Sequence, residues 1–274
     1  MPKSKKKFIG VFDSGFGGIN VLRGIVRKLP AYNYIYLGDT ARTPYGTRSK
    51  EVVYDFTKQA LDFLFANNCD LVILACNTAS SDALRRIQQE YVPKYYPGKK
   101  VLGVLVPAAE EAAVKTKNGQ VGIMATEGVV KSGAFQRELI KLNSKIKIFQ
   151  NPCPLLVPII EAGGQNSKAT NIILEDYLKP LKQKGIDTLI LGCTHYGILE
   201  NRIRKIAGAR ITIISGAKVV PKKLKDYLER HPEIERKVGK NKIVRFYSTD
   251  LTDTFTRLGS KFFGKKIKAL KASL

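Results

Sequence analysis

Short apolar runs alternate with longer amphipathic segments along most of the chain. The runs are rich in Val, Ile, Leu and aromatic residues, which favour β-strands. The longer segments, such as EVVYDFTKQALDFLFANN at residues 51–68, repeat apolar residues at the period of a helix. This alternation predicts an α/β fold with mostly parallel sheets flanked by helices. Strands are expected at Phe8–Phe12, Tyr34–Leu37, Leu71–Ala75, Val101–Val106, Val121–Met124, Ile146–Phe149, Thr188–Leu191, Ile211–Ile214 and Ile243–Tyr247.

Two pairs of segments echo each other in the same order. DLVILACNTAS at residues 70–80 is similar to DTLILGCTHYG at residues 187–197, with a cysteine at the matching position. IGVFDSG at residues 9–15 is similar to VGIMATEG at residues 121–128. The echoes predict two similar doubly wound domains related by a pseudo-twofold axis, with the active site between them.

Two breaks in the pattern suggest where these domains meet. Residues 91–100, YVPKYYPGKK, are rich in Pro, Gly and Lys, and the second break lies around SGAK at residues 215–218. We therefore expect a first domain of residues 1–98 plus 215–274 and an inserted second domain of residues 99–214.

Cysteine and histidine usage limits the chemistry. Among 274 residues there are four cysteines and two histidines, and no Cys-x-x-Cys or His-x-x-x-His pair occurs. This argues against a disulfide framework and against a metal site. No apolar run approaches the roughly 18 residues of a membrane span. The lysines at the N-terminus are not followed by an apolar segment, so a secretory signal is not expected and the cytoplasm is the expected location.

The formal net charge of +24 leaves two interpretations open, and residues 221–274 are especially rich in lysine and arginine. A basic surface can bind nucleic acid weakly by neutralising phosphates. Alternatively, the lysines simply form a solvated surface. No recognition motif or aromatic-basic signature accompanies the charge, which favours the solvated surface.

Two cysteines follow buried strands directly and precede helical patterns: Cys76 and Cys193. Ligands of open α/β sheets bind beyond the carboxyl ends of the strands, and a helix N-terminus lowers the pKa of a thiol. Two thiols on opposite sides of one ligand could remove a proton from one face of a carbon and deliver a proton to the other. Asp13 and His195 could each assist one thiol.

Other polar residues near these strand ends could bind a ligand's carboxylates. Asn77, Thr78 and Thr194 follow the two cysteines, and the polar loop at residues 39–49 follows another strand. DSGFGG at residues 13–18 looks like a phosphate loop, but it matches neither known glycine-rich fingerprint.

Alternative interpretations apply to individual cysteines. Cys69 lacks polar neighbours suited to chemistry, and both Cys69 and Cys153 are expected to be structural. Cys193 with His195 could form a nucleophile for acyl transfer, which would leave Cys76 unexplained.

Several motifs together resemble the signatures of the glutamate racemase family across essentially the whole chain. They are FIGVFDSGFGGINVL, YLGDTARTPYG, LACNTAS, CPLLVPIIE, LGCTHY and the closing FYSTD. The resemblance implies interconversion of L- and D-glutamate without pyridoxal phosphate or any other cofactor, supplying D-glutamate for peptidoglycan. The related aspartate racemases carry CNTAH and GCTE, whereas Ser80 and His195 stand at those positions here, which favours glutamate.

The resemblance also implies a role for each matched residue. Cys76 and Cys193 would exchange protons with opposite faces of the substrate, Asp13 would assist Cys76, and His195, supported by Glu161, would assist Cys193. The substrate contacts implied are Ser14, Pro44, Tyr45, Gly46, Asn77, Thr78, Thr126 and Thr194.

Two positions depart from the family pattern. Val129 stands where relatives usually have a second threonine, and Ile214 replaces a common acidic residue. The expected assembly is a homodimer. The alternatives are a two-cysteine racemase of a related acid such as aspartate, or a basic nucleic-acid-binding protein that has this fold.

Overall fold

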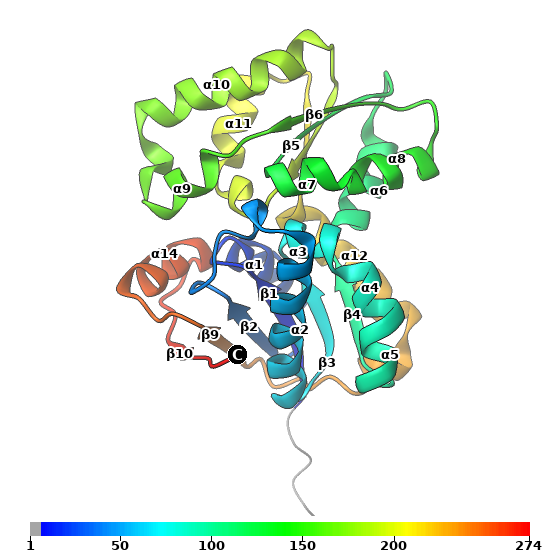
Figure 1. Ribbon diagram of the computed structural model, residues 1–274, viewed down its shortest axis with the longest axis vertical. Helices are drawn as coiled ribbons and strands as arrows, with labels where there is room; N and C mark the ends of the chain where they lie inside the picture. Colours follow the sequence, from blue (N-terminus) through cyan, green and yellow to red (C-terminus); the bar gives the residue numbers. More distant parts are fainter. Residues whose placement is uncertain (1–6) are drawn as a thin grey trace, which may run out of the picture.

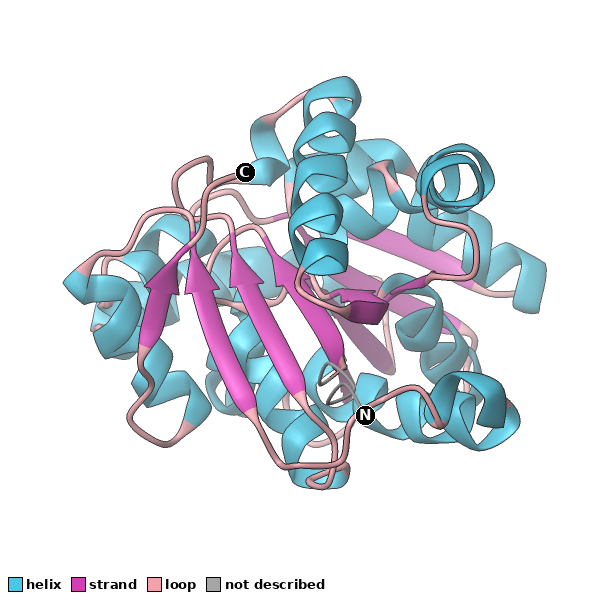
Figure 2. Cartoon of the chain, turned by 90° about the horizontal axis from the view of Figure 1, so that it is seen from below, coloured by secondary structure: helices cyan, strands magenta, loops and turns pink. Residues whose placement is uncertain are grey.

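The computed structural model describes residues 7–274, which form two parallel β-sheets covered by helices (Figure 1). The first sheet has six strands in the order β10-β9-β2-β1-β3-β4, and every neighbouring pair is parallel. Figure 2 shows strands of a sheet side by side, pointing the same way, with helices on both sides. The strands are β1 (Phe8–Asp13), β2 (Tyr34–Gly38), β3 (Cys69–Leu74), β4 (Lys100–Gly103), β9 (Val244–Ser248) and β10 (Ala269–Lys271).

The second sheet has four parallel strands in the order β6-β5-β7-β8. They are β5 (Gln120–Ala125), β6 (Lys147–Pro152), β7 (Thr188–Gly192) and β8 (Thr212–Ser215). The order β2-β1-β3-β4 in the first sheet is repeated here strand for strand. The prediction of two similar α/β halves is therefore confirmed, and β9 and β10 extend the first sheet on one side.

The helices connect successive strands and cover the sheets. Short 3₁₀- and π-helices lie between them. The 3₁₀-helices are η1 (Tyr45–Thr47), η3 (Gly164–Asn166) and η4 (His195–Leu199), and the π-helix is η2 (Ile87–Tyr91). No helix among residues 7–274 is long and apolar enough to cross a membrane. The α-helices are α1 (Gly18–Lys28), α2 (Lys50–Ala66), α3 (Asn77–Asp82), α4 (Leu84–Arg86), α5 (Val92–Tyr95), α6 (Leu105–Lys115), α7 (Glu127–Ser132), α8 (Ala134–Leu142), α9 (Leu156–Glu161), α10 (Lys168–Gln183), α11 (Glu200–Ala207), α12 (Gly216–Arg230), α13 (Pro232–Glu235) and α14 (Asp253–Phe263).

The chain leaves the first sheet later than the break at residues 91–100 suggested. That segment forms α5 and a turn into β4, which pairs with β3. The domain boundary expected at residue 98 therefore falls before the last strand of this part of the first sheet. The strand expected at Val101–Val106 is also shorter, because Leu105 already begins α6.

Helix α12 brings the chain back to the first half and packs against α1. Gly24 of α1 makes this approach close, since a Cβ atom at position 24 would lie 2.2 Å from the carbonyl oxygen of Ala217. That separation is far inside van der Waals contact with backbone that has little freedom to move. A glycine is therefore required where the two helices meet.

The variant Gly24→Ala is expected to force the two helices apart. We expect the free energy of unfolding to fall by about 1–3 kcal/mol, although alanine favours the helix by about 1 kcal/mol. Urea denaturation measures the change. Gly216→Ala is the matched control, because the nearest atom to a Cβ there is 3.7 Å away. An equal or smaller loss for Gly24→Ala than for the control would contradict the packing argument.

Candidate active site

A cavity lies between the two halves, where strands of both sheets end. The residues that follow β1, β3, β5 and β7 line the cavity with Ser14, Cys76, Thr126 and Cys193. The structure thus brings both cysteines, His195 and every expected substrate contact to one place. The complete lining is Ser14, Thr43, Pro44, Tyr45, Gly46, Cys76, Asn77, Thr78, Thr126, Val157, Gly192, Cys193, Thr194 and His195.

The cavity is small in this conformation. Its volume is about 20 Å³, which is about the room that one water molecule needs. Cys76 and Cys193 are 5% and 9% exposed, so solvent barely reaches either thiol. The entry of a ligand the size of an amino acid therefore requires the surrounding elements to move apart.

The Cys76 thiol is held at the start of α3. Its Sγ accepts a hydrogen bond from the Ala79 N–H and donates one to Ser14 Oγ, both at 3.5 Å. Burial, followed by the negative charge of Asp13, raises the pKa of Cys76 to about 12. The expected lowering by the helix N-terminus does not occur, because loss of solvation outweighs the hydrogen bonds. At neutral pH Cys76 is a thiol, able to donate a proton.

A hydrogen-bonded chain runs from Cys193 to the edge of the site. Cys193 Sγ lies 3.8 Å from His195 Nδ1, and His195 Nε2 lies 3.1 Å from Glu161 Oε1. Burial alone lowers the pKa of His195, but the bonds to Cys193 and Glu161 outweigh it and raise this pKa to about 10. His195 therefore carries its proton at neutral pH, which suits a partner that stabilises a thiolate.

Asp13 ends β1 and is fully buried. Its carboxylate accepts hydrogen bonds from Thr194 Oγ1 at 3.0 Å and from the Gly15 N–H at 3.2 Å. Burial raises the pKa of Asp13, against the opposing effects of His195 and of these bonds. Ser14, and not Asp13, makes the side-chain hydrogen bond to Cys76. No hydrogen bond between Asp13 and Cys76 occurs among the described residues, and the expected assistance of Cys76 by Asp13 stays a prediction that depends on charge alone.

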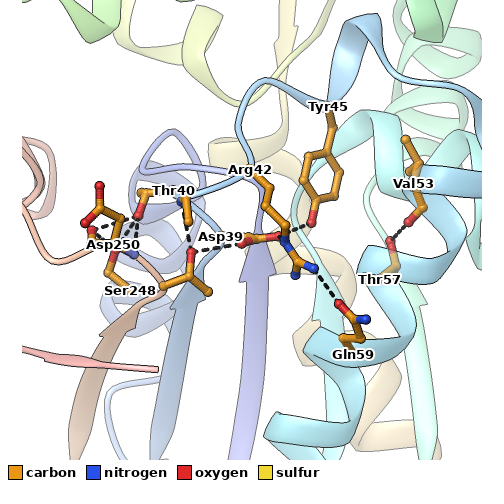
Figure 3. A network of polar contacts seen from close by, with 11 residues as sticks. Asp39, Thr40, Arg42, Tyr45, Val53, Thr57, Gln59, Ser248 and Asp250 are labelled. Atoms are coloured by element: carbon orange, nitrogen blue, oxygen red, sulfur yellow. Dashed lines mark hydrogen bonds and ion pairs between the residues drawn. The ribbon is translucent and has the colours of Figure 1, made fainter. Parts of the chain in front are cut away.

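The loop after β2 carries Tyr45 into the cavity wall. Its hydroxyl donates to the buried carboxylate of Asp39, which also accepts from Arg42 Nε at 2.7 Å and Thr249 Oγ1 at 2.8 Å (Figure 3). The Tyr45 hydroxyl is therefore engaged by Asp39, a residue that does not line the cavity, although Tyr45 itself does.

A second set of hydrogen bonds fixes the start of this loop to the end of β9. The Thr40 hydroxyl lies 2.6 Å from Ser248 Oγ and 2.8 Å from the Asp250 carbonyl oxygen (Figure 3). The motif FYSTD at residues 246–250 thus positions the loop that forms one wall of the cavity.

The two halves touch directly at the cavity. Thr78 Oγ1 of the first half lies 3.2 Å from Thr126 Oγ1 of the second. A Cβ atom at Gly46 would lie 2.7 Å from the Thr126 Cβ, so only glycine permits this approach. Thr126 also accepts from the N–H of Val129 at 3.4 Å. The Val129 side chain is buried in the core of the second half and does not line the cavity.

The sequence did not single out Thr43, Val157 or Gly192, although each lines the cavity. Thr43 lies in the polar loop already suspected of contacting a ligand, and Val157 lies one helical turn before Glu161. Asp39 was also not singled out, and its role depends on contacts with distant parts of the chain. Cys69 and Cys153 are buried away from the cavity lining. No group of three or more His, Cys, Asp and Glu side chains that could hold a metal occurs in residues 7–274.

Comparison with known proteins gives matches that include both halves of the chain. The family model described as Asp/Glu/Hydantoin racemase matches residues 9–223. A glutamate racemase of Geobacter metallireducens is 36% identical over 262 residues, covering 95% of this chain and 94% of the relative. A glutamate racemase of Persephonella marina is 38% identical over 268 residues, covering 97% of each chain.

Solved structures of glutamate racemases have folds similar to that of this chain. A glutamate racemase of Bacillus anthracis superposes with a TM-score of 0.90 at 32% identity, over 98% of both chains. A glutamate racemase of Francisella tularensis, crystallised with D-glutamate, gives a TM-score of 0.87 at 31% identity, again over 98% of both. The chain belongs to the Asp/Glu/hydantoin racemase family. The recognition made from its motifs is therefore confirmed.

The variant Glu161→Gln tests the charge distribution beside Cys193. Removing the negative charge takes away one of the groups that raise the pKa of His195, so His195 should lose its proton at lower pH. We expect its titration midpoint to fall by at least about one unit. NMR of histidine-labelled protein resolves the change, since the chain has two histidines. Glu233→Gln, beside the exposed His231, should leave the His195 midpoint unchanged. An unchanged midpoint in Glu161→Gln would contradict the geometry.

Proposed function

We propose that this protein is a glutamate racemase that interconverts L- and D-glutamate through two cysteine thiols, without pyridoxal phosphate. The observation that supports this most strongly is the placement of Cys76 and Cys193 on one cavity, each at the end of the equivalent strand of its half. The relatives named glutamate racemase, which cover nearly the whole chain, support the choice of glutamate.

The proposed chemistry is a pair of proton transfers. One thiolate removes the proton from Cα, so that a C–H bond breaks and an S–H bond forms. The other thiol then donates its proton to the opposite face of the carbanion, restoring a C–H bond with inverted configuration. No electrons are lost or gained overall. Because no cofactor delocalises the carbanion charge, exclusion of water and fixed hydrogen-bond donors must stabilise it.

The surroundings of the two thiols fit complementary roles. Burial keeps Cys76 protonated at neutral pH, whereas Cys193 Sγ lies 3.8 Å from the protonated imidazole of His195. In one direction Cys193 would therefore be the base and Cys76 the acid. Each turnover exchanges the protonation states of the two thiols, which leaves the enzyme ready for the reverse reaction.

The remaining cavity residues suit the recognition of an amino acid with a second carboxylate. The Asn77 amide and the hydroxyls of Ser14 and Thr194 provide polar side chains on the wall. The first N–H groups of η1, at Tyr45 and Gly46, have no partner within that turn and can donate to a carboxylate. The alternative substrate is a related acid, above all aspartate.

The biological role that we propose is the supply of D-glutamate for peptidoglycan in the cytoplasm. Assembly as a homodimer remains a prediction. The net charge of +24 supports, as a secondary property, weak and salt-sensitive binding to nucleic acid. Replacing lysines in residues 221–274 by glutamate should remove that binding and leave racemisation intact.

The direct test uses purified protein with no pyridoxal phosphate. Optical rotation is followed from L-glutamate, from D-glutamate and from both enantiomers of aspartate. The proposal predicts that both glutamate solutions lose their rotation while aspartate changes far more slowly. Equal rates for aspartate would favour the alternative substrate. Unchanged rotation of all four solutions, with both thiols reduced and the protein folded, would refute a racemase function for these acids.

A further inference from the structure

One hydroxyl on the cavity wall differs from all the others. The remaining hydroxyl groups of the lining already have partners within the protein, whereas Thr43 Oγ1 is buried without any hydrogen-bond partner among the described residues. The paired hydroxyls join Ser14 to Cys76, Tyr45 to Asp39, Thr78 to Thr126, and Thr194 to Asp13.

An unpaired buried hydroxyl costs free energy, so its persistence needs an explanation. Thr43 is not needed to hold its loop in place, because the neighbouring residues Asp39, Thr40 and Tyr45 are fixed by their own hydrogen bonds. A bound molecule in the cavity would supply the missing partner.

The surroundings of Thr43 place its hydroxyl close to the reacting groups. A Cβ atom on Gly15 would lie 3.4 Å from Thr43 Oγ1, 3.2 Å from Glu161 Oε1 and 3.6 Å from His195 Cε1. Because Gly15 has no side chain, the space beside its Cα is bordered by Thr43 Oγ1, Glu161 Oε1 and the His195 ring. The hydroxyl lies on the same side of the cavity as the Cys193–His195–Glu161 chain.

The chemistry of the adjacent backbone indicates what the hydroxyl binds. The residues after Pro44 begin η1, whose first N–H groups, at Tyr45 and Gly46, have no partner within the turn. Thr43 precedes these N–H donors in the chain and lines the same cavity, and a hydroxyl together with N–H donors suits a carboxylate rather than an ammonium group.

We propose that Thr43 is a further substrate-binding residue, whose hydroxyl donates a hydrogen bond to a carboxylate of the bound amino acid. The assignment rests on the proposed glutamate racemase function. Thr43 differs in this respect from the other hydroxyls of the cavity wall, which already form hydrogen bonds within the protein.

The test compares Thr43→Val, which keeps the shape and removes the hydroxyl, with Thr43→Ser, which keeps the hydroxyl. We expect Thr43→Val to raise KM for glutamate by about ten- to a hundredfold, with kcat changed less than about threefold. Thr43→Ser should stay within about threefold of the unmodified protein. The melting temperature of Thr43→Val should not fall, since no hydrogen bond within the protein is lost.

Two competitive ligands identify which carboxylate is bound. Glutarate has two carboxylates and no ammonium group, and 2-aminobutyrate lacks the side-chain carboxylate. If Thr43→Val weakens inhibition by glutarate alone, the contact is to the side-chain carboxylate. If inhibition by both compounds weakens, the contact is to the α-carboxylate.

Two results would overturn the assignment. An unchanged KM and unchanged inhibition in Thr43→Val would show that the hydroxyl does not touch the ligand. A reduced kcat with unchanged KM and a shifted pH profile would show that Thr43 only positions Glu161. If the unmodified protein fails to racemise glutamate, the proposed function fails by itself, and calorimetric binding of glutamate to the three proteins still tests the contact.

Discussion

Replacing either cavity cysteine by serine, in Cys76→Ser or Cys193→Ser, should lower the rate of glutamate racemisation by at least about a thousandfold. A serine hydroxyl is far less acidic than a thiol, so the substituted side neither removes nor donates a proton at a useful rate. The other thiol remains in place on its own face of the substrate. Polarimetry with each enantiomer measures the loss.

The two variants should also differ from each other in a specific way. The remaining thiol can remove the Cα proton of the one enantiomer that faces it and return a solvent-derived hydron to the same side. In D₂O each variant should therefore place deuterium in one enantiomer without inverting it, and the two variants should act on opposite enantiomers. Cys153→Ser is the matched control, because Cys153 is buried outside the cavity lining. Exchange of the same enantiomer by both variants would contradict the two-sided arrangement.

The second large effect is expected for His195→Asn. The asparagine has no group that takes up a proton, so Cys193 loses the cation that stabilises its thiolate. We expect kcat/KM to fall by about a hundredfold or more. Because the transition state is shared, the loss should be equal from L- and from D-glutamate. Steady-state kinetics from both enantiomers measures it.

His231→Asn is the matched control for this variant. His231 lies on the surface and bonds to Glu233, far in sequence from the cavity residues. It should retain full activity. Full activity in His195→Asn would show that Cys193 needs no imidazole, and the proposed role of His195 would be wrong.

Much of the fold could be predicted because strand signals here are strong and repeated. Strands β1 and β7 are buried along their whole length, so their apolar runs are uninterrupted. The similarity of the two halves was predicted from two echoes, one between the cysteine segments and one between IGVFDSG and VGIMATEG. The domain boundary expected at residue 98 assigned β4 to the second domain, although β4 pairs with β3 in the first sheet. Pro and Gly residues suggested that boundary, but they also occur in the turn that leads into a strand. The edge strand β10 (Ala269–Lys271) has only three residues, of which two are exposed, so it gave no signal in the sequence.

The location of the site was predictable, whereas its internal contacts were not. The cavity residues follow strand ends directly, and parallel sheets gather such residues at one edge. The bond from Asp39 to Thr249 joins residues 210 positions apart, which no local pattern reveals. The pKa of Cys76 was expected to fall and instead rises, because full burial depends on the closure of both halves around it.

In the proposed mechanism, two different thiols serve the two faces of the substrate. The most direct measurement starts from fully protonated L-glutamate in D₂O and analyses both enantiomers by mass spectrometry in the first few per cent of reaction. With two thiols, we expect one deuterium in every D-glutamate molecule formed and almost none in the remaining L-glutamate, because the proton removed stays on one thiol while the other delivers deuterium. D-glutamate that retains the original proton, or deuterium that enters L-glutamate as fast as product forms, would instead show a single acid/base group and rule out the two-thiol mechanism.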